Sequence, residues 1–237
     1  MFIKKTFILL VALIVLSGCA TVSRQAYNKD ASQQIRKIAI AEASDDETIG
    51  ALIVAHPGTG FGLIGGLIAA ADMQAKTTRI TSAINPQKTQ LRHRFVTDLS
   101  ASLNNLGYET EIVQINKGVD EKKAISLLKE KTKSDAVIFA DVSGLYVAAG
   151  PTTPYAPFVR VKVKAESSSD SKVLYEDTIT WGYSFGNNTQ TVHLSGGDSY
   201  HYEDISAIEN SADQAREALW NGVNAITAQI SNDLRRN

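Results

Sequence analysis

The sequence predicts an α/β fold, a mixed sheet of about five strands in the order βαβαβββα with helices packed on it and a glycine-rich apolar insertion after the first strand. Three observations predict this fold. Apolar runs of strand length alternate with amphipathic helical segments in the first half of the chain, two strands joined by a turn-rich link follow, and an amphipathic helix ends the chain. The first half requires parallel crossovers, and the linked pair adds antiparallel strands to the same sheet.

The first strand is predicted at residues 36–41, a short apolar run. A helix follows at residues 90–106, where large apolar side chains recur every three or four positions and Gly107 ends the pattern. Residues 108–115 alternate as a strand with one clearly mixed face. That mixture predicts a position near a sheet edge.

A second helix is predicted at residues 120–131, which combine a small apolar face with a dense, solvated face of charges. The continuous apolar run at residues 136–142 predicts a strand buried on both sides. Residues 158–165 and 173–183 form the antiparallel pair, because the link at residues 166–171 is rich in turn-forming serine.

Two loops and one helix complete the chain. Residues 151–157 contain three prolines and a tyrosine, which predicts an extended exposed loop, either a connection between strands or a partner-docking element. Residues 185–200 are polar and predict a second loop. The last helix begins near Ser211, which has capping-box spacing to Gln214, and its apolar face is expected to pack on the sheet.

The N-terminus has the layout of a secretory signal. Lys4 and Lys5 precede an apolar run at residues 7–16, followed by Ser17 and Gly18. A helix needs about 20 apolar residues to span a bilayer, so a permanent transmembrane anchor is disfavoured.

Leu16-Ser17-Gly18-Cys19 resembles the bacterial lipobox. The resemblance implies cleavage between Gly18 and Cys19, a diacylglyceryl thioether on the Cys19 sulfur and an acylated (palmitate-type) N-terminus, which together anchor the protein firmly. The residue after Cys19 is Ala20 and not the aspartate that favours retention at the inner membrane. We therefore expect an outer-membrane lipoprotein that faces the periplasm.

The predicted organisation is a signal peptide at residues 1–18, a lipidated tether at residues 19–34 and a single domain at residues 35–237, with the glycine-rich insertion at residues 49–71. Cleavage removes two of the 24 basic residues and leaves 22 against 25 acidic ones, a formal charge of −3. This charge gives no indication of nucleic-acid binding. Cys19 is the only cysteine, so acylation leaves no thiol for a disulfide, a metal or a nucleophile.

Residues 36–236 resemble a periplasmic α/β domain found in three groups of proteins: the curli-secretion channel lipoprotein, the lipoprotein activators of peptidoglycan synthases and the N-terminal domain of the Tol translocation protein. The resemblance rests on Lys37-Ile38-Ala39-Ile40, on the helix ending Leu103-Asn104-Asn105-Leu106-Gly107-Tyr108, on Ser134-Asp135-Ala136-Val137-Ile138-Phe139 and on the last helix. The chain has Ala140-Asp141 where such proteins often have glycine, and it lacks a counterpart of the barrel-forming hairpins. These departures disfavour a secretion pore, and a shared fold alone does not assign a task.

The insertion at residues 49–71 contains no formally charged side chain. Within it Gly58, Gly62, Gly66 and Ala70 recur every fourth position, which on a helix makes a small-residue stripe suited to close packing. Three alternatives follow: membrane contact or self-association, packing of a helix or hairpin on the domain itself, and a flexible loop. The spacing Gly60-x-Gly62-x-x-Gly65 also matches a dinucleotide fingerprint, but the acidic residue expected about twenty positions later is missing.

Gly182-Tyr183-Ser184-Phe185-Gly186 matches the G-x-S-x-G pattern of serine hydrolases, with His193 or His201 and Asp198 or Asp204 as conceivable partners. A nucleophile elbow needs a helix directly after the serine, and polar loop residues follow instead. The histidines at 56, 93, 193 and 201 have no ligand spacing, and Glu203 beside His201 does not supply one.

We therefore expect no metal, no cofactor and no catalytic residues. The leading hypothesis is a non-enzymatic envelope lipoprotein that binds periplasmic or outer-membrane proteins and forms homo-oligomers through residues 49–71. Two alternatives stay open, a lipoprotein that inserts into the membrane through its glycine-zipper segment and an envelope hydrolase that uses Ser184.

Overall fold

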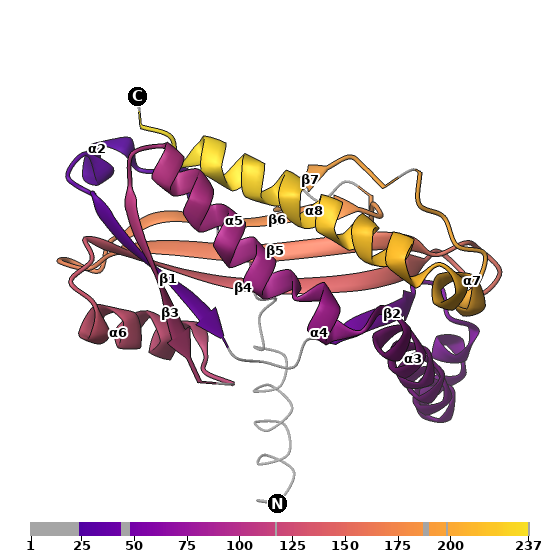
Figure 1. Ribbon diagram of the computed structural model, residues 1–237. Coiled ribbons are helices and arrows are strands. Elements are labelled where there is room, and N and C mark those ends of the chain that lie inside the picture. The colour runs from indigo at the N-terminus through magenta and orange to yellow at the C-terminus, as the bar shows by residue number, and fades with distance from the viewer. Residues whose placement is uncertain (1–23, 44–47, 117, 187–189, 198, 237) are drawn as a thin grey trace, which may run out of the picture.

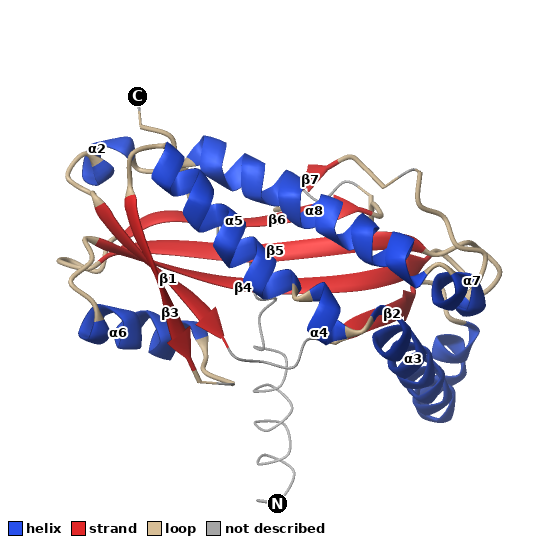
Figure 2. Cartoon of the chain, in the orientation of Figure 1, coloured by secondary structure: helices blue, strands red, loops and turns tan. Residues whose placement is uncertain are grey.

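The computed structural model describes residues 24–43, 48–116, 118–186, 190–197 and 199–236. Its centre is a mixed seven-stranded sheet with helices on both faces (Figures 1 and 2). The strands are β1 Lys37–Ala43, β2 Ile49–Ile53, β3 Glu109–Ile115, β4 Ala136–Ala148, β5 Ala156–Ser167, β6 Val173–Gly182 and β7 Val192–Leu194. The predicted mixed α/β fold is confirmed.

The helices differ in how they lie relative to the sheet. Two of them, α5 and α8, lie across one face of the sheet, whereas α3 projects from one end of the molecule (Figure 1). The elements are α2 Lys29–Ser32, the 3₁₀ helix η1 Pro57–Phe61, α3 Gly62–Ile84, α4 Pro86–Thr89, α5 Leu91–Asn105, α6 Glu121–Lys131, α7 Ile205–Asn210 and α8 Ala212–Asp233.

The sheet has the order β3-β1-β4-β5-β6-β7. β1 is parallel to both β3 and β4, whereas β4, β5 and β6 form an antiparallel meander. β2 pairs in parallel with the second half of β4, along the edge whose first half pairs with β1. β3 is an edge strand of the described sheet, as its face of mixed apolar and polar residues predicted.

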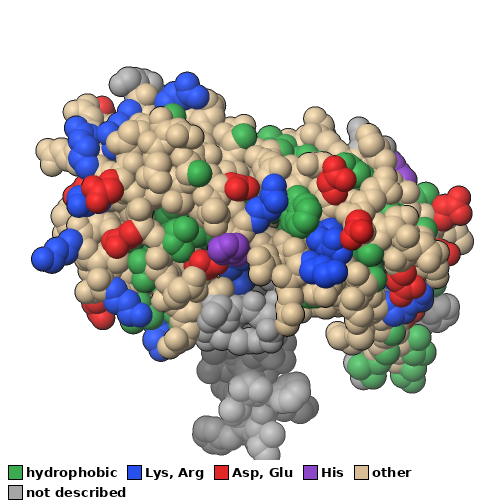
Figure 3. Space-filling view, in the orientation of Figure 1, with side chains coloured by type: hydrophobic (Ala, Val, Ile, Leu, Met, Phe, Trp, Pro, Cys, Tyr) green, Lys and Arg blue, Asp and Glu red, His purple; other side chains and the backbone are tan. Residues whose placement is uncertain are grey.

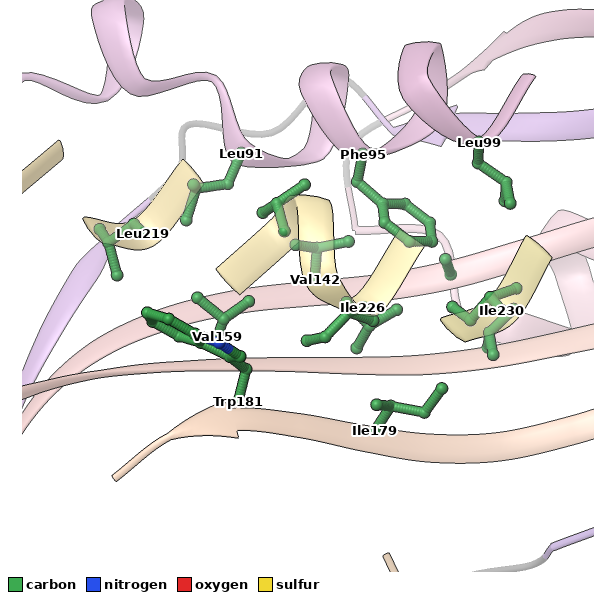
Figure 4. Packing of buried hydrophobic residues seen from close by; sticks show 14 of the residues in the cluster. Leu91, Phe95, Leu99, Val142, Val159, Ile179, Trp181, Leu219, Ile226 and Ile230 are labelled. Atoms are coloured by element: carbon green, nitrogen blue, oxygen red, sulfur yellow. The ribbon is translucent and has the colours of Figure 1, made fainter. Parts of the chain in front are cut away.

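The larger hydrophobic core lies between the sheet and the layer of α5 and α8. Every fourth residue of α5 is buried, because this spacing places the side chains on one helical face. Figure 4 shows these side chains pointing at the apolar face of α8 and at the strands. The labelled members are Leu91, Phe95, Leu99, Val142, Val159, Ile179, Trp181, Leu219, Ile226 and Ile230.

Gly222 lets α8 approach the sheet closely. A Cβ at this position would lie 2.6 Å from Cε3 of Trp181 and 2.7 Å from Cγ2 of Val159. Any larger residue would therefore push α8 away from β5 and β6.

The opposite face of β1 and β4 is covered by α6. A smaller apolar cluster forms there, with Ala124, Ile125 and Leu128 of the helix buried. Asp120 begins the helix, since its side chain accepts a hydrogen bond from the backbone N–H of Lys123. The cluster also includes Ala39, Ala41, Ile115 and Val137.

A row of ion pairs joins α6 to β5 beside this cluster. Nζ of Lys164 lies 3.3 Å from Oε1 of Glu121 and 3.0 Å from Oε1 of Glu166. Lys162 and Lys129 extend the row at both ends, each 2.9 Å from one of these carboxylates. Burial alone would raise the pKa of Glu166, but hydrogen bonds from Lys129 and Lys164 outweigh it and hold that pKa below its ordinary value.

Several details of the predicted fold are wrong. The sheet has two more strands than the order βαβαβββα provides, because Ile49–Ile53 forms β2 and the predicted loop at residues 185–200 contains β7. Residues 49–71 are therefore not an insertion outside the sheet. Ser211 is the N-cap residue of α8, but its side chain makes no cap hydrogen bond, so the predicted capping box is not formed.

Candidate functional site

The second half of α3 is fixed to the sheet through β2. Ile80 and Ile84 are completely buried. Oγ1 of Thr77 accepts a hydrogen bond of 2.9 Å from the backbone N–H of Ala51, and Oγ1 of Thr81 donates one of 3.1 Å to the carbonyl of Ile49. Side chains of α3 therefore satisfy the outer edge of β2, which would otherwise be open to another strand.

A small polar network holds the turn before α3. Nδ1 of His56 accepts a hydrogen bond of 3.0 Å from the backbone N–H of Gly58, so the proton of a neutral ring is on Nε2, which lies 3.2 Å from Oδ2 of Asp72. Lys76 donates to the same carboxylate. This hydrogen bond from Lys76, together with the one from His56, lowers the pKa of Asp72 against the effect of burial.

Gly58 lies where η1 folds back on α3. A Cβ at Gly58 would lie 2.6 Å from the carbonyl oxygen of Gly65 and 3.1 Å from Cβ of Ala69. Gly65 and Ala69 are the buried side of this part of the helix. The absence of a side chain at Gly58 therefore allows η1 to close on the helix.

The outer side of the same helical turns is apolar and exposed. Ile64, Leu67 and Ile68 are 74%, 64% and 62% exposed. They follow the i, i+3, i+4 spacing of one helical face. Figure 3 shows hydrophobic side chains gathered at this end of the molecule, over α3.

The predicted small-residue stripe is divided between different surroundings. Gly58 lies in η1 and contacts the buried side of α3, whereas Gly62 begins the helix. Gly66 faces open space, and Ala70 is exposed. The role of residues 49–71 in association stays a prediction, and the described exposed surface there includes the large side chains of Ile64, Leu67 and Ile68.

No helix in the described part of the chain is both long enough and apolar enough to cross a membrane. The predicted signal peptide, the cleavage position after Gly18 and the lipid attachment at Cys19 lie outside the described residues. They stay predictions.

The described part of the predicted tether, residues 24–34, packs against the domain. Nε of Arg24 donates to Oδ2 of Asp177 across 3.1 Å. Gln25 pairs with Glu176 of β6 as an antiparallel bridge, with backbone hydrogen bonds of 2.7 and 2.9 Å. The backbone N–H of Asn28 donates to the carbonyl of Leu174 at 2.8 Å. The domain boundary at residue 34 stays a prediction, but these contacts hold the chain to β6 from Arg24 onward.

The structure brings together three of the residues considered for a hydrolase. Ser184, His193 and His201 line one cavity of about 320 Å³ beside the end of β6. Oγ of Ser184 accepts a hydrogen bond of 3.3 Å from the backbone N–H of Gly186, and Nδ1 of His193 lies 3.2 Å from Oγ1 of Thr180. Phe185 and Gly186, the two described residues directly after Ser184, are not helical, whereas a nucleophile elbow enters a helix at the serine.

Of the two acidic partners considered for this site, Asp204 does not line the cavity. Asp204 begins α7, where its side chain accepts a hydrogen bond of 2.8 Å from the N–H of Ala207. Asp198 lies outside the described residues. Within the described ranges no group of three histidine, cysteine or acidic side chains is placed to hold a metal ion. His93 lies apart from the other histidines and contacts the buried Glu42, with 2.7 Å between Nδ1 and Oε1.

Among the comparisons with known proteins, only the comparison with solved structures finds proteins similar to this chain. No protein-family model matches the chain, and no curated protein matches it. A PelC dodecamer from Paraburkholderia phytofirmans is 12% identical, with a TM-score of 0.36, over 90% of this chain and 95% of that one. Lipoprotein GNA1162 from Neisseria meningitidis is 14% identical, with a TM-score of 0.29, over 83% and 99%.

A third similar structure is a putative neuraminyllactose-binding hemagglutinin homolog from Helicobacter pylori. It is 10% identical, with a TM-score of 0.31, over 92% of this chain and 89% of that one. At these identities and scores the likenesses assign no role to any residue. The predicted resemblance to the curli, Tol and peptidoglycan-synthase-activator group is not confirmed by them.

Proposed function

We propose that the chain is a lipid-anchored envelope protein whose domain binds other proteins and catalyses no reaction. One observation carries the proposal: Leu16-Ser17-Gly18-Cys19 follows two lysines and an apolar run of signal-peptide length. The thioether on Cys19 and the acylated N-terminus supply enough hydrocarbon for stable anchoring. Ala20 after the cysteine favours the outer membrane, with the domain on the periplasmic side.

The docking of residues 24–28 on β6 supports a short distance between domain and membrane. Cys19 and Arg24 are five residues apart, so the chain between them reaches at most about 17 Å at about 3.4 Å per residue. The lipid would therefore hold the domain against the membrane surface. Without the Arg24 and Gln25 contacts the next docked residue is Asn28, and the reach from Cys19 would grow to about 31 Å.

The free edge of β3 supports the protein-binding part of the proposal. β3 pairs only with β1 among the described strands, and Ile112 at its centre is 39% exposed. An open edge with an apolar side chain is a surface on which an extended segment of another protein adds a strand. Glu109 and Glu111 on the same strand disfavour pairing of two identical edges, because like charges would meet.

Crosslinking in the intact envelope tests this function. The acylated protein is captured from its native membrane after mild crosslinking, alongside an Ile112→Asp variant and an Arg160→Ala control on β5. We expect a protein partner that is recovered with the parent and the control and is reduced with Ile112→Asp. A strictly monomeric protein that recovers no partner would contradict the proposal.

A second candidate function is hydrolysis by Ser184. Its supporting observation is the shared cavity of Ser184, His193 and His201. Phe185 and Gly186 after Ser184 are not helical and Asp204 serves as a helix cap, which makes this the weaker candidate.

A further inference from the structure

The outer face of the first half of α3 is an apolar surface with no cover from the described part of the chain. Ile64, Leu67 and Ile68 are each more than 60% exposed on successive turns. Exposed apolar clusters of this kind mark contacts with a membrane or a partner. A single exposed apolar side chain needs no explanation, but three such side chains on one helical face do.

The rest of the helix holds this face outward. Ile80 and Ile84 anchor the second half of α3 in the core, and Arg79 binds Glu209 of α7 through two hydrogen bonds of 2.8 and 2.7 Å. At the other end, Gly58 closes η1 on the buried side at Gly65 and Ala69. The apolar face therefore cannot turn inward without breaking these contacts.

The size of the face favours lipid over a second copy of the chain. A stable protein interface uses roughly 20–30 residues on each side. Three large apolar side chains on one helix fall far short of that number. An interfacial helix, by contrast, needs only a short apolar face that enters the boundary between headgroups and acyl chains.

The position of the proposed anchor also favours lipid. With Arg24 docked on β6, the five residues from Cys19 to Arg24 keep Arg24 within about 17 Å of the lipid-bearing residue, so the domain stays at the bilayer surface. A tethered surface meets its target as an intramolecular event, so even a weak apolar contact becomes populated.

We propose that the first half of α3 lies in the membrane interface, with Ile64, Leu67 and Ile68 in contact with lipid acyl chains. The contact is superficial and does not span the bilayer. The first charged residue after this face is Asp72, one turn beyond Ile68, and it is paired with Lys76 and His56. These polar side chains limit how far along α3 the helix can enter the apolar part of the membrane. The inference rests on the proposed lipid anchor.

The single cysteine of the chain makes a direct test feasible. Acylation of Cys19 leaves no free thiol, so a cysteine introduced by Leu67→Cys is the only site for a fluorescent NBD label on the full-length lipidated protein. The protein is reconstituted in vesicles of phosphatidylethanolamine and phosphatidylglycerol that contain nitroxide-labelled lipid. Ile64→Cys serves as a second reporter, and Thr78→Cys, on the exposed side of α3 about 16 Å further along, serves as the matched control.

We expect the nitroxide lipid to quench the label at positions 64 and 67 about threefold more strongly than at position 78, because an interfacial helix buries its apolar face about 5–10 Å deep. Equal quenching at all three positions, in protein that floats with the vesicles, would overturn the inference and leave the lipid anchor standing. Disulfide-linked dimers of the unlabelled Leu67→Cys protein after treatment with an added oxidant, together with no quenching of the labelled protein, would overturn it in favour of a second copy. Failure of the protein to float with the vesicles would show instead that the lipid anchor is wrong.

Discussion

Nε of Arg24 lies 3.1 Å from Oδ2 of Asp177 and joins the first described residue of the chain to strand β6. Asp177 is 3% exposed, whereas the Arg24 side chain is 53% exposed. Burial raises the pKa of Asp177, although Thr178 and Arg24 act in the opposite direction. Arg24 is thus the cation that offsets part of the penalty for a buried carboxylate, five residues from the proposed lipid.

Removing this cation should loosen the N-terminal segment. We expect Arg24→Ala to lower the free energy of unfolding by about 1–2 kcal/mol, since a buried charge loses its hydrogen-bond partner but the exposed half of the pair is screened by solvent. Urea denaturation measures the loss, and hydrogen exchange at residues 24–28 reports the release of the segment.

Arg160→Ala is the matched control for Arg24→Ala. Arg160 pairs with Asp141 at 3.4 Å, and both side chains are almost half exposed. Its removal should change stability by less than about 0.5 kcal/mol. Equal effects of the two variants would contradict the docking of Arg24.

Two glycine substitutions near α3 should have opposite effects. Gly58→Ala places a Cβ against the carbonyl of Gly65 and should destabilise the protein by about 1–3 kcal/mol. Gly66→Ala meets nothing within 4 Å and should stabilise it by up to about 1 kcal/mol through helix propensity. Thermal unfolding of both variants checks the signs. Two shifts in the same direction would show that η1 does not pack on α3 as described.

The ion-pair row on β5 should make stability depend on pH. Glu166 has a pKa below its ordinary value of 4.5 in the folded protein, so its contribution is fully present above that value and is lost as the pH falls below it. We expect Glu166→Gln to cost about 1–2 kcal/mol at neutral pH and progressively less in acid. Urea titrations of the parent and the variant from pH 7 to about pH 3 measure this convergence.

The more exposed Asp141 provides the comparison for Glu166. Asp141→Asn should change stability by less than about 0.5 kcal/mol over the same pH range, because its side chain is 46% exposed. A Glu166→Gln effect that does not depend on pH would mean that the carboxylate is not held ionised by Lys129 and Lys164.

The hydrolase candidate has its own test. We expect a fluorophosphonate probe to leave the protein unlabelled, because Phe185 and Gly186 after Ser184 are not helical and the described lining of its cavity contains no acidic residue. Labelling of the parent that disappears in Ser184→Ala, with His193→Ala reducing it as well, would establish the hydrolase in place of the binding protein.

Helices α5, α6 and α8 and the core strands β1 and β4 could be predicted because each carries its own local signal. Leu91, Phe95 and Leu99 recur every four residues, and the chain at Ala136–Ala148 begins with a continuous apolar run. Burial of one face is decided locally in these elements. The structure of these elements therefore follows their sequence pattern.

The missed elements depend on distant partners. β2 contains small residues without alternation, and it becomes a strand because β4 extends to Ala148 and because Thr77 and Thr81 cover its outer edge. The Arg24–Asp177 contact spans 153 positions and leaves no local signal. The G-x-S-x-G pattern is a local match whose meaning depends on the chain that follows it. Phe185 and Gly186 directly after Ser184 are not helical, whereas a nucleophile elbow requires a helix there.

Acylation of Cys19 is the most direct test of the proposed function. Cells that express the full-length chain or a Cys19→Ser variant are labelled with a palmitate analogue, and their membranes are separated by density. We expect the parent to carry the label, to lose residues 1–18 and to sediment with the outer membrane, and the variant to remain unlabelled and unprocessed. A Cys19→Ser protein that is processed and membrane-bound like the parent would contradict the lipid anchor.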